Sequence, residues 1–254
     1  MAAEKATAIV LRLVEFSETS SVVTLFTEEF GRVAVLAKGA RRAKNAFDSA
    51  LDLLTVCRLV FLRKSSGGLD LLTEAKLVRR FRPSGRDLAP LYAGYYVAEL
   101  LLNLVDDYDP HPELFRATDG TLARLCSGQD VPATVLRFEL TALRLLGHLP
   151  SLSLCVECGE PVAAEGRIAF GQLAGGVLCR SCRPGKRHVV SISAAVLNVL
   201  RAMASERETG RQDAQLDSQV QGELRGVMNH YISHLLGKKL KLQPLLGFLA
   251  SPQR

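Results

Sequence analysis

Four cysteines offer the clearest chemistry in this chain of 254 residues. They form two Cys-x-x-Cys pairs, Cys155 with Cys158 and Cys179 with Cys182, and 20 residues separate the pairs. Each pair supplies two sulfur ligands from one tight turn, and two such turns complete the tetrahedral sulfur set that suits Zn²⁺. A closed set of four protein ligands leaves no position for water, so the pattern predicts a structural ion. Two disulfides or four ordinary thiols are the alternatives.

The residues around these pairs predict a zinc ribbon. Gly159 follows the first pair, and Pro184-Gly185 follows the second, where the chain must turn back. Residues 167–170 read as a short strand that Gly175-Gly176 can reverse into a second one. The N-terminus shows no secretory signal, so we expect a reducing cytosol, where paired cysteines favour metal over disulfides.

The sequence does not contain a constellation that indicates catalysis. The five histidines fall in no metalloprotease, Cys/His or Ser/His frame, and the phosphate-loop pattern of ATPases is missing. His188, six residues after Cys182, is a further ligand candidate, although a solvated loop histidine is the simpler interpretation. His230 and His234 are one helical turn apart, but two histidines alone rarely hold a metal. We therefore predict a protein that is not an enzyme. We also expect no membrane span, because no apolar run reaches about 18 residues without a charge.

The net charge of +6 is confined to one part of the sequence. Residues 1–86 hold 15 Lys and Arg against 9 Asp and Glu, whereas residues 87–254 hold 17 of each sign. The first third therefore carries the whole excess, 15 minus 9, which is the distribution expected of a confined surface that binds a polyanion. A merely solvated basic face is the alternative.

The candidate phosphate-binding residues fall into two groups. A loop without apolar periodicity carries Lys38, Arg41, Arg42 and Lys44. Predicted strands and their ends carry Arg63, Lys64, Lys76, Arg79 and Arg80. Phenylalanine is the only aromatic residue type in this third, and we expect most of these side chains in the core. Binding should therefore rest on phosphate contacts, depend strongly on salt and show little sequence preference.

Two smaller basic groups occur later in the chain. Arg180, Arg183, Lys186 and Arg187 surround the second cysteine pair and would extend a nucleic-acid surface. At the C-terminus, lysines 238, 239 and 241 stand beside leucines 242, 245 and 246. An apolar pocket rimmed by cations would accept an acidic, hydrophobic peptide, and plain packing of the C-terminus is the alternative.

Residue patterns predict an α+β protein with a β-rich start. Five short apolar or alternating runs read as strands: 8–16, 22–27, 32–38, 53–62 and a last run from residue 69. Gly31 supplies the positive φ of the turn before the third strand. In the fifth strand, alternation directs Leu71 and Ala75 inward and Lys76 outward. Five strands in about 75 residues have the size of a small closed barrel such as an OB-fold.

The hydrophobic period changes to that of helices after Pro83-Ser84-Gly85. Helices are expected at 87–106, 113–126 and 132–146, which can pack as a bundle. Further helices are expected at 193–204, with Ser191 or Ser193 as the cap, and from 216 onward. The predicted domains are an OB-fold domain at 1–82 and a helical domain at 87–254, with the zinc ribbon inserted at 150–188.

Several runs of this sequence resemble the RecO family of bacterial recombination mediators. Residues 5–11 are similar to that family's first strand, and residues 23–33 and 37–42 match the segments that follow. The ribbon also matches, from Cys155-Val156-Glu157-Cys158-Gly159 through Phe170 to Gly175–Cys179 and Cys182. The likeness covers nearly the whole chain in the same order. The polar stretch 205–217 departs from the pattern and leaves the number of C-terminal helices open.

This resemblance implies an N-terminal OB-fold, a helical C-terminal domain and a structural zinc site. It implies a bacterial cytoplasmic, nucleoid-associated protein of DNA repair that binds single- and double-stranded DNA and anneals complementary strands. RecO-like proteins act with RecR, and in some settings RecF, to load RecA onto DNA coated by single-strand-binding protein, whose acidic tail the helical domain contacts. Lys38, Arg41, Arg42 and Lys44 would hold phosphates. A zinc-ribbon factor that regulates through RNA or a specific duplex is the alternative.

Overall fold

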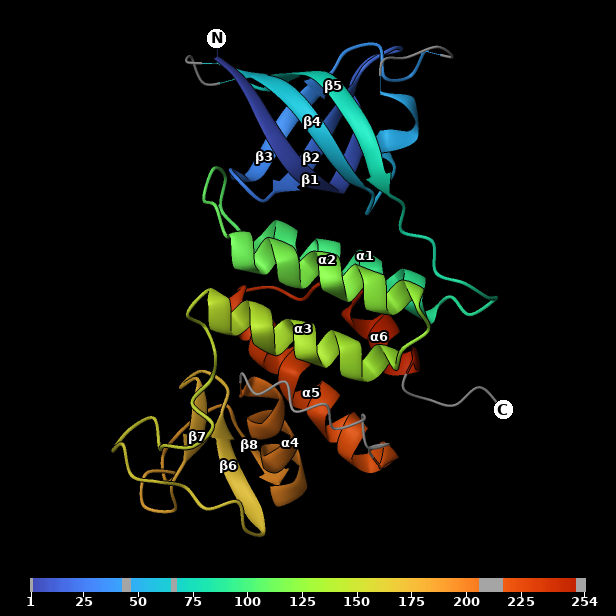
Figure 1. Cartoon of the computed structure of the whole chain (residues 1–254). Helices are drawn as coiled ribbons and strands as arrows, with labels where there is room; N and C mark the ends of the chain where they lie inside the picture. Colours follow the sequence, from blue (N-terminus) through green and yellow to red (C-terminus); the bar gives the residue numbers. More distant parts are fainter. Residues whose placement is uncertain (1, 43–46, 65–67, 206–216, 250–254) are drawn as a thin grey trace. The chain divides into compact units, whose positions relative to one another are not determined.

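The computed structural model describes residues 2–42, 47–64, 68–205 and 217–249. The chain forms two compact units, residues 1–129 and 130–254. Figure 1 shows a β-barrel followed by helices and a small second sheet. No helix within the described ranges is long and apolar enough to cross a membrane.

Five strands of the first unit close into a barrel in the order β1-β2-β3-β5-β4 (Figure 1). These strands are β1 (Ala2–Glu15), β2 (Ser21–Thr27), β3 (Gly31–Ala37), β4 (Val56–Arg63) and β5 (Asp70–Arg79). β3 and β5 run parallel, and the other neighbours are antiparallel. The short 3-10 helix η1 (Asp48–Leu51) packs against β4 and β5. The predicted five-stranded OB-like barrel is therefore confirmed.

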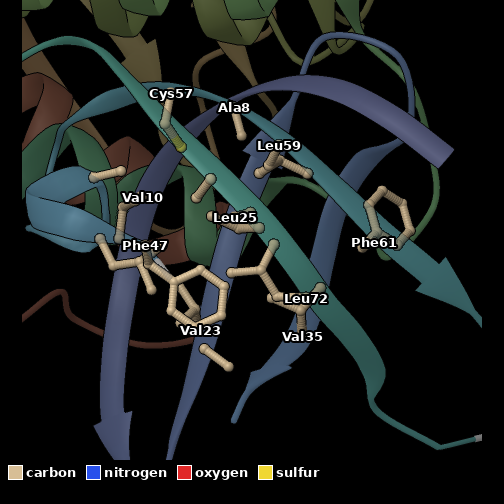
Figure 2. Packing of buried hydrophobic residues seen from close by; sticks show 14 of the residues in the cluster. Ala8, Val10, Val23, Leu25, Val35, Phe47, Cys57, Leu59, Phe61 and Leu72 are labelled. Carbon is tan, nitrogen blue, oxygen red and sulfur yellow. The ribbon is translucent and has the colours of Figure 1, made fainter. Parts of the chain in front are cut away.

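Aliphatic and aromatic side chains fill the barrel, as Figure 2 shows for Leu25, Phe61 and their neighbours. On β5, however, Leu72 and Ala75 point inward, and Leu71 stays partly exposed on the outside. The expectation that Leu71 faces the core was wrong because the β4–β5 register shifts between Val60 and Phe61. Such an irregularity moves every following side chain to the other face of a strand.

Two helices belong to the unit of the barrel: α1 (Ala89–Leu104) contacts β1, and α2 (Pro112–Cys126) contacts β2. The third helix of the expected bundle, α3, belongs to the other unit. The Phe115 ring packs against the Phe26 ring at 5.8 Å between centroids. The barrel and its two helices therefore share a core.

The loop between α1 and α2 contacts one end of the barrel. The Arg32 guanidinium binds the Asp107 carboxylate at 2.6 Å, and the Tyr108 hydroxyl donates to the buried Asp70. Gly31 has a φ of 67°, as predicted, and the Asp109 backbone lies where a β-carbon would be. Glycine is therefore required there for both its conformation and its size.

The second unit combines helices with a three-stranded sheet in the order β7-β6-β8 (Figure 1). Its helices are α3 (Val131–Leu145), α4 (Ala194–Ala204), α5 (Ser218–Leu235) and α6 (Gln243–Leu249). Its strands are β6 (Arg167–Gly171), β7 (Gly176–Leu178) and β8 (Val189–Ser193). The Ser193 hydroxyl caps α4 by accepting from the Val196 N–H at 3.3 Å, which confirms the predicted serine cap.

Candidate metal centre and nucleic-acid interface

The two cysteine pairs meet in space, as their spacing predicts. The sulfurs of Cys155, Cys158, Cys179 and Cys182 all lie within 4.8 Å of one another. The Cys158 and Cys179 sulfurs are 3.8 Å apart. Zinc–sulfur bonds of about 2.3 Å place tetrahedral sulfurs about 3.8 Å from each other, so the set has the dimensions that zinc requires. All four ligands are thiols, which also matches zinc.

Short backbone hydrogen bonds build each turn of the cluster. In the first turn, the Gly159 N–H donates to the Cys155 carbonyl at 2.9 Å. In the second, the N–H groups of Cys182 and Arg183 donate to the Cys179 carbonyl at 3.2 and 3.1 Å. The Cys179 N–H donates across to the Cys155 sulfur at 3.3 Å, so the two turns contact each other directly.

Electrostatics at the cluster suits a cation. Burial raises the pKa of the Cys155 thiol, but several backbone N–H groups, led by that of Cys179, lower it to about 6. Hydrogen bonds to the Cys179 and Cys158 sulfurs raise the pKa of the Cys182 thiol to about 12. Neighbouring sulfurs thus oppose further deprotonation once one thiolate exists. A divalent cation removes that opposition, since metal ligation deprotonates thiols.

The ribbon is supported by the helices of its own unit. The Phe170 ring of β6 is fully buried and meets the Tyr231 ring of α5 edge-on at 6.1 Å. The Arg201 side chain of α4 donates to the carbonyls of Leu152 and Val162 at 2.9 and 2.7 Å. These carbonyls flank the first cysteine pair, so α4 holds that turn in place.

Histidines do not join the candidate metal centre. Among the described residues, the cysteine set is the one group of three or more potential ligands that converge. His188 is exposed and packs edge-on against His234 at 5.4 Å. Four sulfurs therefore form a closed set without it.

The basic loop after β3 is exposed and partly fixed. Lys38, Arg41 and Arg42 are exposed, and Lys44 lies outside the described residues. The Arg41 guanidinium donates to the Ser17 carbonyl at 3.0 Å and pairs with the Glu15 carboxylate at 3.0 Å. Its backbone N–H donates to the Thr19 carbonyl at 3.1 Å. Arg41 thus braces the turn between β1 and β2.

The other predicted phosphate-binding residues do not join this loop. Arg63 pairs with Ala2, at the start of β1. The other end of β1 is next to the basic loop, because Glu15 pairs with Ser21 of β2 and Ser21 pairs with Ala37, the last residue of β3. Arg63 and Lys64 therefore lie at the opposite end of the barrel. There the Arg63 guanidinium stacks over the Tyr108 ring at 4.4 Å.

The three remaining cations occupy different places again. Lys76 is exposed on the outside of β5, and Arg80 is partly buried. Arg79 pairs with the Asp119 carboxylate of α2, which makes it a structural contact within the first unit. Among the described residues, Lys38, Arg41 and Arg42 are exposed together on the loop, whereas the five predicted cations after it lie elsewhere on the first unit.

Two residues of interest escaped the sequence analysis. Arg58 is exposed on β4 directly opposite Lys76. Phe16 is 64% exposed, although Phe26, Phe47 and Phe61 are buried as expected. The sequence feature that could have indicated the exposure of Phe16 is its position directly before the polar run 17–20, where β1 has ended.

Comparisons with known proteins cover both units. Residues 1–81 match the sequence profile described as "Recombination protein O N terminal", and residues 85–244 match "Recombination protein O C terminal". A protein named DNA repair protein RecO from Rhodopirellula baltica is 48% identical over 202 residues, covering 79% of this chain and 75% of the relative. A relative of the same name from Anaeromyxobacter sp. (strain K) is 34% identical and covers 96% of this chain and 98% of its own length. Another from Myxococcus xanthus is 33% identical and covers 92% of this chain and 93% of its own length.

Proposed function

The chain belongs to the RecO family of DNA repair proteins, and on that basis we propose that it is a non-enzymatic recombination mediator that binds DNA and anneals complementary strands. The observation that carries the proposal is the exposed basic loop of Lys38, Arg41 and Arg42 at one end of an OB-like barrel. Barrels of this class bind oligonucleotides on the face of strands 2 and 3, between the β1–β2 and β4–β5 loops. The loop directly follows β3, so it adjoins that surface.

Annealing follows from the physics of phosphate contacts. Two complementary strands repel each other because both are polyanions, and a cationic surface that holds both lowers this repulsion. The strands must also slide until their bases are in register. Phosphate contacts permit sliding because they do not read sequence. A few flexible cations therefore suit annealing better than a set of base-specific hydrogen bonds.

Partners are also part of the proposal. We expect the chain to act with RecR, and in some settings RecF, in loading RecA onto DNA that is covered by single-strand-binding protein. The segment from Lys238 to Lys241 is our candidate for contacting the acidic tail of that protein. Its lysines are exposed, while Leu240 is buried beside them. We place this activity in the bacterial cytoplasm, at the nucleoid.

The four cysteines are proposed to hold one structural zinc ion. The ion would fix the two turns of the ribbon and would take no part in a reaction, since its coordination is closed. Lys186 pairs with Glu157 at 2.7 Å and so joins the second turn to the first. Arg180, Arg183 and Arg187 are exposed around the second turn and would add to a DNA-binding surface.

Strand annealing tests the proposal directly. Complementary oligonucleotides, bare or coated with single-strand-binding protein, should anneal faster with the protein, and more salt should reduce the gain. The double variant Lys38→Glu/Arg42→Glu should lose the gain with an unchanged melting temperature. Equal annealing by this variant and the wild type would overturn the proposal. Preferential binding of RNA or of one duplex in competition would favour a zinc-ribbon regulatory factor instead.

A further inference from the structure

The end of β1 and the turn after it carry apolar side chains that the barrel does not cover. Leu13 and Val14 are 45% and 41% exposed, and Phe16 at the end of the strand is 64% exposed. We call residues 12–20 the hairpin tip. Phe16 differs from Phe26 and Phe61 of the same unit, which are fully buried. Its ring contributes little to the core, so the fold alone does not account for an aromatic residue at this position.

The hairpin tip is held firmly. The N–H groups of Phe16 and Ser17 donate to the Ser20 carbonyl at 3.0 and 3.2 Å, and the Ser20 N–H donates to the Ser17 hydroxyl at 3.2 Å. From the other side, Arg41 binds the Ser17 and Thr19 carbonyls. Phe16 is therefore presented from a fixed backbone, and a partner that packs on its ring need not first order the turn.

Phe16 directly follows β1, and its N–H still pairs across the hairpin with the Ser20 carbonyl, so the alternation of the strand puts it on the face of Arg12 and Val14. Val14 pairs with Val22, and Val22 pairs with Leu36 of β3. This face therefore continues across the outer side of β2 and β3 to the basic loop that begins at Lys38. The face combines the exposed Phe16 ring with the aliphatic side chains of Val14, Val22 and Leu36. Arg12 and Lys38 add a cation on either side of them.

The charges near the ring indicate what it contacts. Arg12, Lys38, Arg41 and Arg42 outnumber the acids Glu15 and Glu18 on the hairpin tip and the basic loop, four to two. Glu15 is already paired with Arg41. An exposed ring surrounded by a positive excess fits a flat apolar group attached to an anion, and an unpaired nucleotide has this composition.

We propose that Phe16 stacks on an unpaired base of single-stranded DNA while Lys38 and Arg42 bind the neighbouring phosphates. The inference rests on the proposed DNA-binding function and adds a base contact that the sequence analysis did not expect. One stacking residue per barrel holds one base and leaves its neighbours available for pairing. Binding through this ring tolerates any sequence, since every base presents a π-face.

A single tryptophan can report this contact because the chain contains none. In Phe16→Trp, oligothymidine should change the indole fluorescence, whereas an abasic oligomer of equal length and charge should bind without that change. The matched control is Val78→Trp. Val78 is 53% exposed on β5, which pairs with neither strand of the hairpin. Its fluorescence should respond to neither oligomer.

Phe16→Ala supplies the second measurement. Its affinity for oligothymidine should fall about 5- to 150-fold, the range for losing one stacked base. Its affinity for the abasic oligomer and the salt dependence of binding should stay as in the wild type. Phe16→Leu, which keeps an apolar side chain without the ring, should behave like Phe16→Ala. Unchanged circular-dichroism melting would exclude a folding defect.

The outcomes separate this inference from the proposed function. If the wild type binds neither oligomer, the proposed function itself fails. If the wild type binds both oligomers equally and Phe16→Ala has no effect, phosphate binding stands and stacking is overturned. If Phe16→Trp responds to the abasic oligomer as strongly as to oligothymidine, the ring senses backbone binding alone, which also overturns stacking.

Discussion

Removal of two cations from the basic loop should weaken DNA binding by an amount that depends on salt. The variant Lys38→Ala/Arg42→Ala removes two exposed positive charges and keeps Arg41, which braces the hairpin. Each phosphate contact with a single strand contributes about −0.7 to the slope of log affinity against log salt. The variant's slope should therefore be shallower by about 1.4. If both lines meet at 1 M salt, the affinities differ about 25-fold at 0.1 M, or by about 1.9 kcal/mol.

Fluorescence anisotropy of a labelled oligothymidine, titrated from about 50 to 400 mM salt, measures this slope. The matched control is Lys64→Ala/Lys76→Ala, which removes the same charge from the opposite end and the outer wall of the barrel. We expect the control to change the slope much less. Equal changes in both variants would mean that DNA binds over the whole barrel. A parallel loss of affinity at every salt concentration would show that the loop acts through structure instead of charge.

Three further outcomes follow from single contacts. Cys158→Ser should lose equimolar zinc by elemental analysis and melt at a lower temperature, whereas Cys126→Ser, outside the cluster, should keep its zinc. Arg225 and the fully buried Glu139 form an ion pair at 2.6 Å, which Arg225→Met removes. The free energy of unfolding in urea should fall by about 3–5 kcal/mol, and adding Glu139→Leu should largely restore it. Burial and then the hydrogen bond to a carboxylate raise the pKa of Tyr108 from 10.0 to about 12, so its contribution to stability is complete below pH 10 and is lost as pH rises through 12. Wild type and Tyr108→Phe should therefore converge in stability at the alkaline limit, and a constant difference across this range would contradict the assignment.

Local spacing explains why the ribbon was predictable. Two residues between paired cysteines determine how both sulfurs leave one turn, and Gly159 allows the chain to reverse after the first pair. What closes the site is longer-range: Arg201 on α4 binds the loop around Cys155. No sequence pattern near the cysteines points to Arg201 as their support. The prediction of zinc did not depend on it, because that prediction rests on the cysteines alone.

Register and partners explain what the sequence could not reveal about the barrel. A shift in the β4–β5 pairing exchanged Leu71 for Leu72 in the core, and alternation alone cannot locate such a shift. Arg79 was predicted as a phosphate ligand from its charge alone, and the sequence did not reveal its partner Asp119, which is 40 residues further along the chain. Cations that are close in sequence were likewise assumed to share a surface, but the closed barrel sends Arg63 and Arg41 to opposite ends.

The cations at the two ends of the barrel differ in their partners, and we expect this difference to favour one end for DNA. At one end, the loop between α1 and α2 brings Asp107 to Arg32 and the Tyr108 ring to Arg63. The loop thereby gives Arg32 an ion-pair partner and places a ring against the Arg63 guanidinium. At the other end, the Arg41 side chain donates to the hairpin at the Ser17 carbonyl. Phe16, Lys38 and Arg42 are exposed beside it. We therefore expect a polyanion to bind more favourably at the second end than at the first.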